Sequence, residues 1–170
     1  MTHFTGVLAV LHTPTPDGRR LDEPAAELTR PMPLPLACPG EPNIGRIDRV
    51  WRDGDLLRYA GSLDGEHPEA GEIAAEIRAG RLVGNLDAAY TLPSGRLVGE
   101  VKHRYQGREM TEQEMADLPL DADPSDVEMV MCGWLVGRAT LMPSEVKSWP
   151  EVSLVLDDAD PVSPGEEPAT

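Results

Sequence analysis

The sequence is poor in cysteine, in aromatic residues and in long apolar runs. Its 170 residues include two cysteines, Cys38 and Cys132, which form no CxxC pair. Neither a disulfide framework nor a zinc site is therefore expected, and the thiols should be reduced. No apolar run approaches the roughly 18 residues that span a bilayer, and no basic segment precedes an apolar one at the start of the chain. We expect a soluble protein made in the cytoplasm, with no membrane partner and no cofactor.

Basic residues are also scarce. The chain has 15 lysines and arginines against 30 acidic residues, and its net charge is −15 at pH 7. Lysine and arginine supply most of the affinity for a phosphate backbone, so this balance argues against nucleic acid as a partner. Two interpretations of the acidity stay open: the negative charge either keeps the chain away from DNA or simply keeps a small domain soluble.

The last residues differ in composition from the rest of the chain. Residues 157–170 hold five acids, three prolines and no base. Such a segment buries too little apolar surface to offset the entropy lost on ordering. We predict a single domain over residues 1–156, long enough to have its own core, followed by a disordered or draped acidic tail.

The apolar pattern predicts an α+β protein made mainly of antiparallel strands. Asp53-Gly54 suits a tight hairpin turn, and helix signals run from Pro68 to Gly80 with apolar residues spaced i, i+3, i+4 and i+7. A capping pattern from Thr111 predicts a second, short helix. The proline-rich stretch over 24–42 predicts a long ordered loop or an edge. Strands are predicted over 6–11, 44–52, 55–63, 81–90, 96–103, 127–131, 134–142 and 152–156, with 127–131 and 134–142 in the core.

Four segments follow one another in an order that resembles a known family. They are Pro31–Leu36, Ile44–Asp55, Leu82–Asp87 and Gly137–Pro143. Together they resemble the capsid maturation (prohead) proteases of tailed bacteriophages. The resemblance implies a closed or nearly closed antiparallel β-barrel flanked by one or two helices, as in these proteases and in the herpesvirus assemblins.

Both catalytic residues of the family pattern are replaced in this chain. In that pattern one strand carries Gly-x-Ser-x-Asp, and a histidine shortly precedes the Gly-Arg-Ile segment found here at 45–47. Aligning the aspartate with Asp87 puts Asn85 at the serine position and Cys38 near the histidine position. An amide cannot form an acyl-enzyme, and a thiol without a paired base is not an activated nucleophile. We therefore expect an inactive pseudoprotease, with Asn85 and Cys38 as degenerate catalytic positions.

Four residues are candidates for binding. Asn85 and Asp87, two apart on a strand, should share a face, where they would line the old catalytic groove or make structural hydrogen bonds. Trp134 and Trp149 lie in apolar segments and are candidate interface anchors. The acidic run at 121–126 lacks the glycine and the glutamate of a calcium loop, so no metal site is expected.

These inferences point to a non-catalytic phage capsid protein, either a decoration protein or a minor capsid protein. Its expected partner is the major capsid protein, to which it would bind as a homo-oligomer or in many copies. The net charge favours the outer surface of the virion capsid. Two alternatives stay open: an active maturation protease with displaced catalytic residues, using His103 as its base, and a scaffolding or assembly protein.

Overall fold

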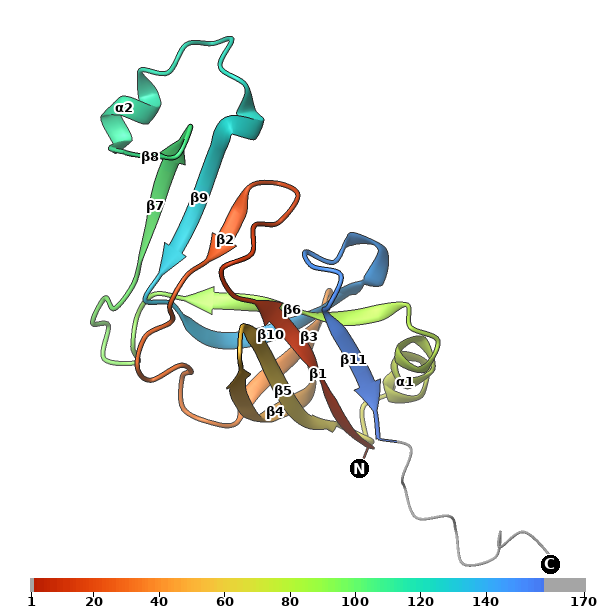
Figure 1. Cartoon of the computed structure of the whole chain (residues 1–170). Coiled ribbons are helices and arrows are strands. Elements are labelled where there is room, and N and C mark those ends of the chain that lie inside the picture. Colours follow the sequence, from red (N-terminus) through yellow and green to blue (C-terminus); the bar gives the residue numbers. More distant parts are fainter. Residues whose placement is uncertain (1, 158–170) are drawn as a thin grey trace, which may run out of the picture.

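The computed structural model describes residues 2–157, without the side chains of residues 41, 42 and 124. A seven-stranded sheet curls into a half-barrel, and a four-stranded sheet projects from it (Figure 1). Two α-helices complete the described part of the chain. The predicted α+β class, mainly antiparallel β, is therefore confirmed. The predicted acidic tail lies outside the described residues, except for Asp157.

The half-barrel has the strand order β11-β1-β5-β4-β3-β10-β6, and only β3 and β10 run parallel. Because the sheet curls, β6 also lies against β1 and β11, and helix α1 contacts both β6 and β11. The elements are β1 (Thr2–Val10), β3 (Leu34–Cys38), β4 (Glu41–Asp53), β5 (Leu56–Leu63), α1 (Ala70–Arg78), β6 (Leu82–Ala89), β10 (Leu135–Pro143) and β11 (Ser153–Leu156).

The second sheet has the order β2-β9-β7-β8 and, with its tip, extends well beyond the half-barrel (Figure 1). Its elements are β2 (Arg19–Leu21), β7 (Glu100–Tyr105), β8 (Arg108–Met110), α2 (Glu112–Ala116), the 3-10 turn η1 (Pro124–Asp126) and β9 (Val127–Cys132). A second 3-10 turn, η2 (Ser144–Val146), follows β10. We call residues 100–132 the arm. The chain enters and leaves the arm at one neck, where a Cβ on Gly99 would lie 2.7 Å from the carbonyl oxygen of Gly133.

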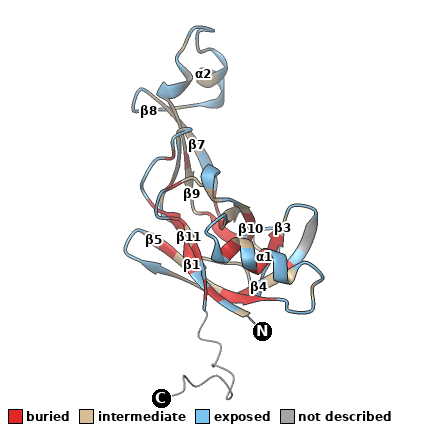
Figure 2. Ribbon diagram, turned by 90° about the vertical axis from the view of Figure 1, so that its right-hand side faces the viewer, coloured by how far each residue is buried: buried red, intermediate tan, exposed pale blue. Residues whose placement is uncertain are grey.

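The core fills the inside of the half-barrel (Figure 2). Tyr59 of β5 packs against Phe4 of β1 with ring centroids 5.5 Å apart. The Tyr59 ring reaches across to β6, where a Cβ on Gly84 would lie 2.3 Å from its hydroxyl oxygen. Burial raises the pKa of the Tyr59 phenol, and this hydroxyl makes no hydrogen bond of normal geometry among the described residues, although it faces the Gly84 backbone. Gly84 therefore lets an aromatic ring fill the space that a side chain on β6 would occupy.

Local signals predicted several elements correctly. Gly54 has a φ of +60° in the two-residue turn between β4 and β5. Helix α1 buries Ile73, Ala74 and Ile77, as the spacing predicted. The capping box at Thr111 is formed with Glu114.

Three predictions about strands need correction. The proline-rich stretch contains β3, which lies inside the sheet rather than in a loop or at an edge. The prolines permit this because β3 pairs with β10 only at Leu36 and Ala37, beyond Pro35. Strand β9 is not a core strand, since Val130 is its one buried residue. Strand β7 begins at Glu100, four residues later than predicted.

Candidate functional site

Asn85 and Asp87 lie on β6 and face the same side, as expected. Their partners across the ladder on β10 are Thr140 and Arg138. The Asp87 carboxylate accepts hydrogen bonds from Arg138 Nε and Thr140 Oγ1, both at 2.7 Å. A register shift between Val136 and Arg138 accompanies this arrangement. Asp87 therefore holds two neighbouring strands together, in the structural role considered for it.

The Asn85 side chain behaves differently from Asp87. It is half-buried and lines a crevice of about 50 Å³, together with Ser148, Trp149 and residues of the β1–β2 segment. Within residues 2–157 the Asn85 amide makes no hydrogen bond, so the structural role considered for it is not observed. Binding sites for small molecules usually have volumes of roughly 300 Å³ or more, so this crevice is smaller than such sites usually are.

Cys38 is not brought next to Asn85. Ala37, not Cys38, is level with Thr140 on β10, which is in turn level with Asn85 on β6. Cys38 is half-buried and packs against the core cluster. His103 lies in the second sheet, across from Met129 and Met110. The residues that a displaced catalytic set would require are therefore distributed over two sheets.

The two tryptophans are core residues rather than surface residues. Trp134 is 0% exposed and its Nε1 donates to the Asp22 carbonyl oxygen at 2.9 Å. Trp149 is 7% exposed and its Nε1 donates to the Thr13 carbonyl oxygen at 2.8 Å. A partner cannot reach side chains that the core covers, so the expectation that they form an exposed anchor needs correction. Trp149 attaches the loop between β1 and β2 to the half-barrel, and Trp134 attaches the residue that follows β2.

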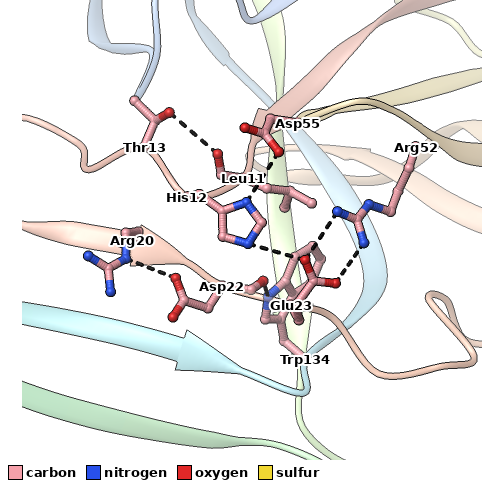
Figure 3. Close-up of polar contacts among 9 residues, drawn as sticks. All are labelled: Leu11, His12, Thr13, Arg20, Asp22, Glu23, Arg52, Asp55 and Trp134. Atoms are coloured by element: carbon pink, nitrogen blue, oxygen red, sulfur yellow. Dashed lines mark hydrogen bonds and ion pairs between the residues drawn. The ribbon is translucent and has the colours of Figure 1, made fainter.

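A polar cluster that sequence reasoning missed surrounds His12 (Figure 3). The imidazole lies between two carboxylates, with Nδ1 3.2 Å from Asp55 Oδ1 and Nε2 3.2 Å from Glu23 Oε1. Glu23 in turn accepts two hydrogen bonds from Arg52, at 2.7 and 3.2 Å. We call His12, Glu23, Arg52 and Asp55 the His12 network.

The His12 network joins three segments that are distant in the sequence. His12 follows β1 with a φ of +61°, Glu23 follows β2, and the β4–β5 hairpin supplies Arg52 and Asp55. The Arg52 guanidinium lowers the pKa of the Glu23 carboxyl below its ordinary value. No local motif announced this network, because it forms only when the strand ends meet.

The His12 network connects segments of the chain and lacks the parts of a catalytic relay. No hydroxyl or thiol among the described residues hydrogen-bonds to His12, and a nucleophile within reach of its base is what a hydrolytic relay requires. The Thr13 hydroxyl donates to the Leu11 carbonyl oxygen at 3.4 Å instead. The network therefore joins the residues on either side of β2, His12 and Glu23, to the β4–β5 hairpin.

Neither a metal centre nor a membrane span stands out in the described chain. Residues 2–157 contain no group of three or more His, Cys, Asp or Glu side chains placed to hold a metal ion. None of the helices in that range is long and apolar enough to cross a membrane. Comparison of the chain with protein-family models, with curated proteins and with solved structures gave no match.

Proposed function

We propose that this chain is a non-catalytic component of a tailed-phage capsid, either a decoration protein or a minor capsid protein. In this proposal it is built on a fold of the prohead-protease type and binds the major capsid protein in many copies. The order of the four sequence segments supports the proposal, and a curled, mainly antiparallel sheet with a helix against its outer strands is compatible with that fold.

The observation that carries the proposal is the state of the strand where the family places its nucleophile. In a hydrolytic relay the carboxylate orients an imidazole. Here the Asp87 carboxylate is engaged by Arg138 and Thr140, and the neighbouring Asn85 offers an amide, which does not attack a carbonyl. This face is therefore suited to holding β6 and β10 together.

The net charge supports a position on the outside of the capsid. At −15 the chain is repelled by packaged DNA, and such repulsion disfavours the lumen. An outer position leaves the acidic surface in contact with solvent. The same charge is compatible with a protein that acts before DNA enters, which is the scaffolding alternative.

Co-assembly tests the proposal. The chain is co-expressed with the major capsid protein of the phage genome that encodes it, and both mature capsids and procapsids are purified by sedimentation. Densitometry of denaturing gels should give a copy number close to that of the capsid protein in mature particles. Presence in procapsids alone would establish the scaffolding alternative, and absence from both particles would refute capsid binding.

The same material tests the absence of catalysis. Intact-mass measurement should show an uncleaved capsid protein, and Asn85→Ser should not react with a fluorophosphonate, because a serine without a base is a poor nucleophile. A defined cleavage that is lost in Cys38→Ala or His103→Ala would instead establish the protease alternative.

A further inference from the structure

The arm lacks a core of its own. Among the described side chains of residues 100–129 none is buried. A small sheet needs a hydrophobic face that is packed, or packing against a helix, to be stable in water. The arm nevertheless carries large apolar side chains, of which Val101 is 39% exposed and Leu120 fully exposed. A covering surface from outside the arm would stabilise it.

The apolar side chains of the arm gather on one face of its sheet. In the β7–β9 register Val101 pairs with Met131, His103 with Met129, and Tyr105 with Val127, so these six residues share a face. Met110 of β8 extends this face beside His103. Met131, at the base, packs against the half-barrel core, whereas the remaining residues stay partly exposed. We call this face without Met131 the apolar arm face; its residues are Val101, His103, Tyr105, Met110, Val127 and Met129.

The opposite face of the arm sheet carries Val130, which is buried, together with charged side chains that are paired with one another. Lys102 lies 3.6 Å from Glu100 and 4.0 Å from Glu109. Arg20 of β2 lies 2.7 Å from Glu128 on this side. This face therefore needs no partner, which leaves the apolar arm face as the side to be covered.

The charge of the arm defines what can cover it. Residues 100–129 hold nine acidic residues against three basic ones. The three cations are already used within the arm: Lys102 by its carboxylates, Arg108 by Glu114 at 3.2 Å, and Arg104 by the Gly107 carbonyl oxygen at 2.8 Å. Five exposed carboxylates of the arm have no cation within ion-pair distance among the described residues. Asp117 and Asp123 accept hydrogen bonds from Gln113 and from the Ser125 backbone, whereas the side chains of Glu112, Asp121 and Asp126 accept none in the described chain.

We propose that the apolar arm face is a docking surface for a positively charged polypeptide segment of a partner protein. The apolar side chains of the partner segment cover Val101, Met129 and their neighbours. The lysine and arginine side chains of that segment form ion pairs with Glu112, Asp121 and Asp126. Like charge disfavours a second copy of the arm as the occupant. The inference goes beyond the proposed function, because it fixes the chemistry of the partner segment whether or not that partner is a capsid protein.

Synthetic peptides test the chemistry of the surface directly. Fluorescein-labelled peptides that alternate lysine with valine, lysine with serine, and glutamate with valine are titrated with the full chain, and binding is followed by fluorescence anisotropy. The lysine–valine peptide should bind most tightly, and added salt should weaken it by screening. Hydrogen exchange read by mass spectrometry should show new protection within residues 100–129.

Neutralising the unpaired carboxylates distinguishes their contribution to peptide binding from the contribution of the overall negative charge of the chain. The arm variant combines Glu112→Gln, Asp121→Asn and Asp126→Asn. The control variant removes the same number of charges from exposed positions outside the arm, by Glu66→Gln, Glu72→Gln and Glu151→Gln. Losing three exposed ion pairs should weaken lysine–valine binding about tenfold in the arm variant, while the control should bind nearly as the natural chain does.

A second pair of variants tests the apolar contribution. Val101→Thr keeps a β-branched side chain on β7, and Val155→Thr makes the same change at a position 60% exposed on β11. Only Val101→Thr should reduce the preference for the lysine–valine peptide over the lysine–serine peptide. The proposal is overturned by equal binding of these two peptides, by equal loss in the arm and control variants, by protection outside the arm, or by no binding.

Discussion

The contact between Tyr59 and Gly84 gives the sharpest prediction about stability. Gly84→Ala places a methyl group 2.3 Å from the Tyr59 hydroxyl oxygen and 2.9 Å from its Cζ. Overpacking of this kind costs roughly 1–3 kcal/mol, and two fixed strands allow little relaxation, so a loss of about 3 kcal/mol in the free energy of unfolding is expected. Tyr59→Phe removes a buried hydroxyl that has no hydrogen-bond partner among the described residues, and should stabilise the protein by about 1 kcal/mol.

The double variant Gly84→Ala with Tyr59→Phe shows whether the contact between these residues causes the loss of stability. With Phe at position 59 the nearest atom to the new methyl group is Cζ rather than Oη, so part of the strain disappears, and a coupling energy of roughly 1–2 kcal/mol is expected. Urea unfolding followed by circular dichroism measures all four proteins. Gly71→Ala, on α1 with open space around it, is the control and should stabilise by about 0.5–1 kcal/mol. Strict additivity of the two core changes would refute the reasoning.

Two further predictions concern Trp149 and the His12 network. Trp149→Ala should lower the free energy of unfolding by roughly 3–5 kcal/mol, because a buried indole is lost and the Thr13 carbonyl oxygen loses its donor. A free energy of unfolding within about 1 kcal/mol of that of the natural chain would show that Trp149 is not a core residue. Arg52→Gln should move the NMR titration of the Glu23 carboxyl upward toward its ordinary pKa of 4.5, whereas Arg58→Gln, which removes the partner of Asp53, should leave Glu23 unchanged. Because the Glu23 pKa is lowered in the folded protein, its stabilising effect should be present above that ordinary value and lost as the pH falls through the folded pKa.

Features determined by neighbours in sequence were predictable. The spacing of Ile73 and Ile77 and the glycine at position 80 defined α1 without reference to the rest of the chain. Gly54 and the capping pair Thr111 and Glu114 are equally local, because each depends on the backbone of its own turn. The shared face of Asn85 and Asp87 followed from strand periodicity alone.

Features determined by distant contacts were not predictable. Strand β9 is apolar except for Glu128, and that pattern does not reveal whether a second layer covers the strand. Trp149 was expected to be an interface anchor, and its burial could not be seen in the sequence because the Thr13 carbonyl oxygen that it donates to lies 136 positions away. The His12 network forms only where three strand ends converge. Strand β3 is an internal strand because β10 pairs with it, at residues that follow Pro35. No local pattern contains this information.

The neck of the arm bears on how such a chain can change its length. Gly99 and Gly133 bring the outgoing and returning backbones into contact at the boundary of the half-barrel. A segment whose two ends touch can be lengthened, shortened or exchanged without moving the strands on either side of it. The half-barrel could therefore stay constant while natural variation or engineering replaces the projecting segment, so that one framework would display recognition elements of different sizes.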